Sequence, residues 1–363
     1  MAATFQHPLM GARFGHLISS LVRNGGVRPR YWPLAAGMVA AATFRAPLSL
    51  VEQVVLRRRL KTGPALEPPV FIIGHWRSGT THLHNILGRS PLFGHISPLA
   101  SGLPDQLLTL ATWLRPWLEK ALPEDRHVDR VAVKPDSPQE DEIPLANLQP
   151  LSIFHALYFP RNFERHVARG VFFDGVTREE ERRWQESMRS FLCKVALHQG
   201  KGQLLVKNPV YTARIRGLRT IWPAARFVYI RRNPYLVYAS TRTYYQTLLK
   251  DLSLQSYAHI DIESFVLDTY IRLLNEYEEQ KKDLDPRHLC EVTFEELEAD
   301  PVGVAKRIHH DLGLEGWSRA EPEIARYLGS IEGYRKNRLD LTKEDIQLVE
   351  RRWHAWLRGY TPP

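Results

Sequence analysis

The chain is short of cysteine, and this shortage excludes several classes of protein. Only two cysteines, Cys193 and Cys290, occur in 363 residues, far apart and without the spacing of a metal site. Two distant cysteines provide neither the disulfide framework of a small secreted protein nor a zinc cluster. We expect both to be reduced thiols, which points to a cytoplasmic protein.

Acidic residues are scarce in the first 62 positions. Nine arginine and lysine residues there stand against a single acid, Glu52, so this segment carries a net charge of +8 out of +9 for the whole chain. The rest of the chain is nearly neutral, and no recognised nucleic-acid-binding module or interleaving of aromatic and basic residues accompanies the charge. We therefore expect no nucleic-acid partner.

A long hydrophobic run is also missing. The apolar stretch Tyr31–Phe44 is shorter than the roughly 20 residues that a membrane-spanning helix needs, and the start of the chain does not resemble a signal peptide. Basic residues on both sides suit a helix that lies in the membrane interface with its arginines on anionic headgroups. A helical arm packed on the body, with Arg57–Lys61 exposed to solvent, explains the same pattern.

Length and composition suggest how the chain is divided. We expect a basic and apolar helical arm, residues 1–62, followed by one α/β domain, residues 63–363. Apolar residues make up 44% of the chain, which is enough for a large core.

The organising motif is a strand, a loop and a helix. Val70–Ile73 predicts a strand buried on both faces, and the apolar spacing from Leu83 to Leu87 predicts a helix. Between them, Gly74 and Gly79 bracket four residues, as in the loop by which nucleoside triphosphatases hold phosphate on backbone N–H groups and a helix N-terminus. The sequence therefore predicts an anion-binding loop.

This loop lacks the lysine of the nucleoside triphosphatases. Thr80 stands in its place, and the cation comes three residues earlier, at Arg77. No ammonium group then reaches the β- and γ-phosphates of ATP from the usual position, which argues against an ATPase or a nucleotide kinase. A glycine-rich turn with an exposed arginine is the plain structural alternative.

Two further strands are each followed by a cation. Gln203–Val206 predicts a buried strand that ends at Lys207, and Arg226–Ile230 predicts another that is followed closely by Arg232. Right-handed crossovers make such strands parallel, so their carboxyl ends lie along one edge of an open sheet, where ligands bind. We expect these two cations to converge with Arg77 on a polyanion.

These motifs together resemble those of the sulfotransferases, which use 3′-phosphoadenosine 5′-phosphosulfate (PAPS) as donor. The loop from Arg77 is similar to the family's 5′-phosphosulfate loop, and Arg232-Asn233-Pro234 with Ser240 is similar to its 3′-phosphate motif. The resemblance implies a P-loop-type open parallel sheet flanked by helices, no required metal, and donor contacts from Arg77, Ser78, Gly79, Thr80, Thr81, Arg232 and Ser240.

The resemblance also assigns two cations outside the loop. The stretch from Leu205 to Pro209 looks like the lysine unit of the tyrosylprotein and bacterial branch, which implies that Lys207 stabilises the transferring sulfonate together with Arg77. Relatives close the donor site with a basic loop near the C-terminus, so candidates for 3′-phosphate contact are Arg335, Lys336 and Asn337. A basic loop exposed to solvent is the alternative.

A dense acidic cluster offers the base that sulfonate transfer needs. Ser137 and Glu140 match a helix capping box, which explains the cluster structurally. Many bacterial relatives carry a similar acidic run, so the resemblance implies that a carboxylate there takes the proton of the acceptor hydroxyl. The candidates are Glu140 first, then Asp141 and Glu142, with His95 as a further alternative.

The acceptor is the least defined part of the prediction. The basic apolar arm suggests a small-molecule or lipid alcohol and a protein at the inner face of the membrane. Two other classes stay open: a catalytically silent P-loop-fold protein that binds at the membrane, and a nucleotide kinase.

Overall fold

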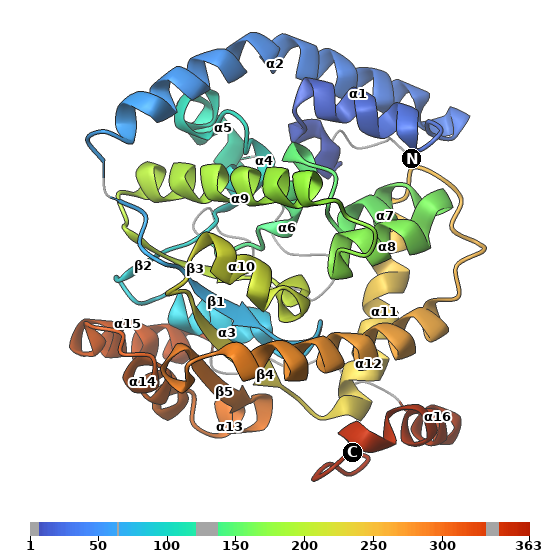
Figure 1. Cartoon of the computed structure of the whole chain (residues 1–363), viewed down its shortest axis with the longest axis vertical. Helices are drawn as coiled ribbons and strands as arrows, with labels where there is room; N and C mark the ends of the chain where they lie inside the picture. The colour runs from blue at the N-terminus through green and yellow to red at the C-terminus, as the bar shows by residue number, and fades with distance from the viewer. Residues whose placement is uncertain (1–6, 64, 121–136, 332–340) are drawn as a thin grey trace. The chain divides into compact units, whose positions relative to one another are not determined.

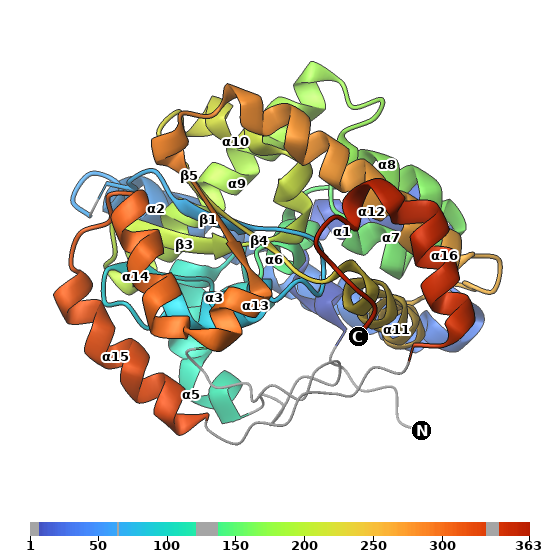
Figure 2. The same cartoon turned by 90° about the horizontal axis from the view of Figure 1, so that it is seen from below.

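The structure of the protein is a computed structural model that describes residues 7–63, 65–120, 137–331 and 341–363. The chain forms two compact units, and Figures 1 and 2 show its helices and strands in two views. The first unit comprises residues 1–67, 94–204 and 248–260, and the second comprises residues 68–93, 205–247 and 261–363.

The first unit is built from helices in the part that the structure describes. Its α-helices are α1 (Phe14–Arg23), α2 (Trp32–Arg59), α4 (Pro98–Gly102), α5 (Thr112–Lys120), α6 (Glu142–Leu148), α7 (Phe154–Tyr158), α8 (Phe163–Phe172) and α9 (Arg178–Gln199). The π-helical turn η3 (Leu107–Ala111) leads directly into α5. The 3-10 turns of this unit are η1 (Pro8–Gly11), η2 (Pro29–Tyr31) and η4 (Pro160–Asn162).

Helix α2 is longer than the sequence predicted. It begins near the apolar stretch but continues past Phe44 to Arg59, with Pro47 inside it, and Figure 1 draws it as an arc. A proline lacks the N–H that would bond to the carbonyl four residues earlier, which accounts for a bend. By length and composition, Pro29–Arg59 could cross a membrane, although core helices and signal sequences pass the same test. The prediction that this segment is too short was therefore wrong.

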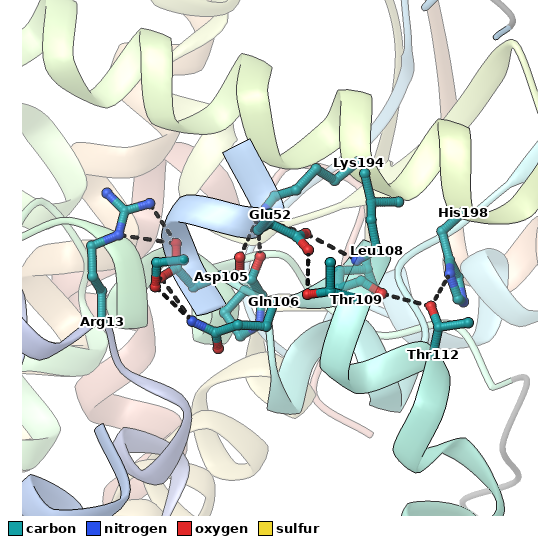
Figure 3. Close-up of polar contacts among 12 residues, drawn as sticks. Arg13, Glu52, Asp105, Gln106, Leu108, Thr109, Thr112, Lys194 and His198 are labelled. Atoms are coloured by element: carbon teal, nitrogen blue, oxygen red, sulfur yellow. Dashed lines mark hydrogen bonds and ion pairs between the residues drawn. The ribbon is translucent and has the colours of Figure 1, made fainter. Parts of the chain in front are cut away.

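A buried polar network fixes the inner face of α2 (Figure 3). Glu52 accepts hydrogen bonds from the backbone N–H of Leu108 at 2.9 Å and from the hydroxyl of Thr109 at 2.8 Å, and its carboxylate lies 3.7 Å from Lys194 of α9. Ser49 donates to Asp105 at 2.5 Å. Burial would raise the pKa of Asp105, but hydrogen bonds and neighbouring cations outweigh it and lower that pKa.

Three histidines with neighbouring rings join four helices of the first unit. The rings of His16 and His155 lie 5.2 Å apart, and those of His155 and His166 lie 5.8 Å apart. His155 contacts the carbonyl of Ala146 through Nε2 at 3.0 Å. Burial lowers the pKa of His155 to about 4, despite its bonds to backbone carbonyls, so the ring is neutral at pH 7.

The second unit is built on a parallel sheet. Its strands are β1 (Val70–Ile73), β2 (Phe93–Gly94), β3 (Gln203–Lys207), β4 (Arg226–Arg231) and β5 (Leu289–Thr293), in the spatial order β2-β3-β1-β4-β5. β1 pairs in parallel with both β3 and β4, and β4 pairs in parallel with β5. Consecutive strands that pair in parallel need a crossover, which the intervening helices supply.

Helices cover both faces of this sheet (Figure 2). The helices of the second unit are α3 (Thr80–Leu87), α10 (Ile215–Ile221), α11 (Pro234–Leu252, whose end belongs to the first unit), α12 (Ile262–Gln280), α13 (Phe294–Ala299), α14 (Pro301–Asp311), α15 (Trp317–Ser330) and α16 (Lys343–Trp353). The 3-10 turns of this unit are η5 (Pro209–Ala213), η6 (Lys281–Asp283), η7 (Pro286–His288) and η8 (His354–Trp356).

The alternation of side chains along β1 decides which helices pack on which face. Val70 and Ile72 join an apolar cluster with α3, α13, α14 and α15. Phe71 points to the other face, where its ring stacks on Phe227 and meets Tyr211 edge-on. The predicted open parallel sheet flanked by helices is confirmed.

We predict that the buried histidines make the protein sensitive to acid. The folded pKa of His155, about 4, is below its ordinary value of 6.5, so the unfolded chain binds the proton more readily. The stability that depends on the neutral ring is fully present above pH 6.5 and is lost as the pH falls toward 4. At pH 5 the free energy of unfolding is lower by about 2 kcal/mol for this reason. Urea unfolding of wild type and His155→Gln at pH 8 and pH 5 measures this.

The glutamine variant keeps a donor for the carbonyl of Ala146 but cannot take a proton. Its free energy of unfolding should fall less between pH 8 and pH 5 than that of wild type. The exposed His354→Gln is the control and should fall as wild type does. Equal falls in all three proteins would contradict the prediction.

Candidate active site

The loop after β1 has a backbone that only glycine adopts freely at two positions. Gly74 has φ +145° and Gly79 has φ +100°. A Cβ on Gly79 would lie 2.2 Å from the ring of Phe294, and one on Gly74 would lie 2.3 Å from the carbonyl oxygen of Ile230. Arg77 also has a left-handed backbone, with φ +67°. Such strain persists where the surrounding structure enforces it, which is common at binding sites.

Thr212 holds the first residue of this loop in place. Its hydroxyl accepts a hydrogen bond from the N–H of Gly74 at 2.8 Å and donates one to the carbonyl of the same residue at 3.0 Å. Thr212 is fully buried in η5, the turn that follows Lys207. The sequence does not indicate this role of Thr212, because a hydroxyl in a turn carries no signal of a partner 138 positions away.

The two predicted phosphate motifs meet at Arg77. Its Nε donates to the hydroxyl of Ser240 on α11 at 2.8 Å, and its carbonyl accepts from Arg232 at 3.2 Å. Lys207, buried at the end of β3, donates from Nζ to the hydroxyl of Thr81 at 3.2 Å. The structure therefore brings all three predicted cations to the same loop.

The loop suits a highly charged anion. Ser78 Oγ and Arg232 Nε are buried and have no hydrogen-bond partner among the described residues. Burial first, and then the charge of Arg77, lower the pKa of Arg232. Since an anion between two guanidinium groups relieves their repulsion and satisfies buried donors, these residues fit the phosphate and sulfonate groups of PAPS.

Phe294 is a second residue that the sequence analysis missed as part of the site. The guanidinium of Arg232 lies over its ring, 4.3 Å from the centroid, and the same ring packs against Gly79. Its neighbours Thr293 and Glu296 form a capping box at the start of α13, a local pattern that says nothing of the contacts of Phe294. Phe294 thus supports both the loop and the cation that faces it.

His75 is the titratable group inside the loop. It is buried against Tyr270, with ring centroids 4.9 Å apart, and its Nδ1 lies 2.8 Å from the carbonyl oxygen of Trp76. Burial lowers the pKa of His75 to about 4, against the opposing effect of that carbonyl. The ring is therefore neutral at pH 7 and adds no charge to the site.

The predicted acidic cluster lies in the first unit, at the start of α6. The helix begins at Glu142 with Asp141 before it and no side-chain cap, so the expected capping box from Ser137 to Glu140 was wrong. Pro144 falls in the first turn, where no N–H is needed, and this allows the later start. Asp141 and Glu142 are buried, whereas Glu140 is half-buried.

Glu142 has a structural partner, because its Oε1 accepts a hydrogen bond from the backbone N–H of Ile153 at 3.0 Å. His95 is held by Gln199, which accepts from its N–H at 3.0 Å and donates to its carbonyl at 2.6 Å. The predicted phosphate contacts Arg335, Lys336 and Asn337 lie outside the described residues. The described residues contain no group of three or more histidine, cysteine or acidic side chains placed to hold a metal ion.

A loop without the Walker lysine, with three cations around it at the edge of a parallel sheet, is the arrangement that the resemblance to sulfotransferases implies. Residues 68–319 match the model of the sulfotransferase family. The chain belongs to this family, and it is an enzyme that takes its sulfonate from PAPS.

Individual relatives agree with this assignment. The chain is 28% identical over 353 residues to the omega-hydroxy-beta-dihydromenaquinone-9 sulfotransferase Stf3 of Mycobacterium bovis, covering 97% of this chain and 90% of the relative. Its fold is similar to that of the sulfotransferase STF9 of Mycobacterium avium, with a TM-score of 0.68 and 14% identity over 97% of each chain. Sulfotransferase STF1 of Mycobacterium tuberculosis gives a TM-score of 0.61 and 18% identity over 94% of this chain and 90% of that one.

We predict that the Thr212 hydroxyl preorganises the loop. Thr212→Val keeps the shape of the side chain but leaves the N–H and carbonyl of Gly74 without partners, at a cost of about 1–3 kcal/mol. The dissociation constant of the product 3′-phosphoadenosine 5′-phosphate, measured by calorimetry, should rise about tenfold. Thr220→Val, which removes a hydroxyl from the surface of α10, is the control. Wild-type affinity in the Thr212 variant would contradict this role.

Proposed function

We propose that the loop from Gly74 to Thr81 and the α3 N-terminus hold the 5′-phosphosulfate of PAPS, and that Arg232 and Ser240 hold its 3′-phosphate. The observation that carries this proposal is the contact of Arg77 with both Ser240 and Arg232. It joins the two phosphate motifs into one cationic site at the carboxyl edge of the sheet. Arg335, Lys336 and Asn337 are proposed as further 3′-phosphate contacts.

The proposed reaction is a direct in-line transfer without a covalent enzyme intermediate or a required metal. PAPS supplies a sulfonate whose S–O bond to phosphate breaks as the acceptor oxygen bonds to sulfur. Arg77 and Lys207 stabilise the negative charge that develops on the bridging and equatorial oxygens. Removal of one such preorganised donor typically raises the barrier by about 3 kcal/mol.

A carboxylate of the α6 acidic cluster is proposed to take the proton of the acceptor hydroxyl. Glu140 is the first candidate, because it is the most exposed of the three and Glu142 already accepts a backbone hydrogen bond. Asp141 and Glu142 remain the alternatives, followed by His95. A carboxylate within hydrogen-bond reach of the acceptor hydroxyl is suited to this step.

The proposed acceptor is a hydrophobic or lipid-like alcohol. The support is the similarity along nearly the whole chain to a sulfotransferase named for an omega-hydroxy dihydromenaquinone. The basic N-terminal arm is consistent with such an acceptor. We propose that residues 1–62 form an arm on the catalytic domain of residues 63–363 and contact the inner face of the membrane, where a lipid alcohol is found.

The donor assignment predicts a specific loss in Arg232→Ala. This variant should bind 3′-phosphoadenosine 5′-phosphate roughly 10- to 100-fold more weakly, because a charge-assisted hydrogen bond contributes about 1.5–3 kcal/mol. The affinity for AMP, which has no 3′-phosphate, should not change. Calorimetric titration of both nucleotides measures the difference.

The neighbouring Arg231→Ala is the matched control, since Arg231 is exposed at the end of the same strand and its loss removes the same charge. It should bind both nucleotides nearly as wild type does. If both variants lost the same nucleotide affinity, the loss would come from the removed charge alone, and a specific contact of Arg232 with the 3′-phosphate would be contradicted. If folded wild-type protein bound neither nucleotide, the proposed donor site would be wrong.

The base is predicted to act on turnover and not on donor affinity. In the series Glu140→Gln, Asp141→Asn and Glu142→Gln, loss of the base should lower kcat by about 10²- to 10⁴-fold. Binding of 3′-phosphoadenosine 5′-phosphate should stay unchanged in that variant. Sulfation of long-chain primary alcohols in detergent, measured with each variant, identifies the group. Full activity in all three would exclude the α6 cluster and direct attention to His95.

A further inference from the structure

We propose that α2 docks on an anionic phospholipid surface, lying along the membrane with its outer face in the interface and its inner face held by the protein. This deepens the proposed contact of residues 1–62 with the membrane. The proposal depends on the arrangement of side chains around α2, and the experiment that tests it measures binding to vesicles, not nucleotide binding or activity. The proposal can therefore fail while the donor site stands.

The outer face of α2 is a continuous apolar stripe. Exposed residues recur three or four positions apart, as on one side of a helix. At 1.5 Å per residue the stripe is about 33 Å long, and Trp32, Phe44 and Leu50 are 64%, 78% and 68% exposed. Its members are Trp32, Ala36, Ala40, Phe44, Pro47, Leu50 and Val54.

The charged side chains in the middle of α2 face the opposite way. Between Trp32 and Leu56 the only charged residues are Arg45 and Glu52, and both are buried. Arg45 donates to the carbonyl of Ala12 at 3.1 Å, and Glu52 is held by α9 and η3 as Figure 3 shows. Both charges of this stretch are thus buried together with Leu34, Met38 and Ala42, and the outer face carries no charge between Trp32 and Leu56.

The burial of both charges against the protein argues against insertion across the bilayer. A spanning α2 would carry Arg45 and Glu52 into hydrocarbon, where charged side chains are costly. It would also leave Lys194, which is 4% exposed, without the carboxylate beside it. A helix that stays on the protein and lies in the interface keeps every one of these contacts.

The charge at the ends of the stripe selects the partner. Exposed cations stand before it and after it: Arg28, Arg30, Arg57, Arg58, Arg59 and Lys61. An apolar face flanked by arginines is complementary to acyl chains below anionic headgroups. A second copy of the chain fits poorly, because parallel or antiparallel pairing of two stripes places cationic ends against cationic ends.

The test is flotation of the full-length protein with vesicles. Wild type should float with vesicles of equal parts phosphatidylglycerol and phosphatidylcholine, less at high salt, and little with phosphatidylcholine alone. The triple variant Phe44→Ser, Leu50→Ser, Val54→Ser should lose binding at least about tenfold, since it removes three side chains from the interface. Unchanged nucleotide binding shows that this variant is folded.

Two matched controls make the result specific to α2. Trp113→Ser with Trp117→Ser removes exposed apolar surface from α5 and should keep vesicle binding. Replacement of Arg57, Arg58 and Arg59 by glutamine should weaken binding. The same change in charge on α9, at Arg178, Arg182 and Arg183, should not.

Three outcomes would overturn the proposal. The first is wild-type flotation of the α2 triple variant. The second is wild-type protein that resists extraction by alkaline carbonate, which indicates a spanning helix. The third is a dimer in sedimentation that the triple variant converts to monomers, with no vesicle binding by wild type, which indicates that a second copy covers the stripe.

Discussion

The parallel pairing of β1 with β3 and β4 is the constraint on which the donor site depends. Ile72 lies opposite Lys207 in one pair and Val228 in the other, so the three strands end at nearly the same height. Lys207 is the last residue of β3, Arg232 directly follows β4, and Arg77 lies in the loop after β1, so all three cations are found at that edge. The loop glycines and Thr212 then fix the backbone of the loop after β1. The register of the strands therefore determines where the cations lie, and these residues determine the shape of the loop among them.

The strands and the loop could be predicted because their signals are local. Four consecutive apolar residues, two glycines at fixed spacing and a cation after each strand are visible in the sequence, and the topology of parallel strands explains why the cations meet. The α3 helix and the capping box at Thr293 follow from the same kind of pattern.

Other features depend on partners far away in the chain. Nothing near Thr212 or Phe294 indicates that one holds Gly74 and the other supports Arg232. The acidic run before α6 looked like a helix cap, but the helix starts later than the pattern suggests. In α2, Ser49 donates to Asp105 and Glu52 accepts from Leu108 and Thr109, and only the tertiary structure shows these contacts.

The buried pair of Glu52 and Lys194 also bears on the order in which the protein is made. Helix α2 leaves the ribosome early, but Lys194 emerges only after residues 60–193 have been synthesised. Until then the inner face of α2 has no α9 to bind, although nascent domains generally fold from the N-terminus onward. Helix α2 is therefore synthesised before the helix that covers its inner face, and throughout that interval the growing chain presents an apolar helix to the targeting factors and chaperones that attend translation.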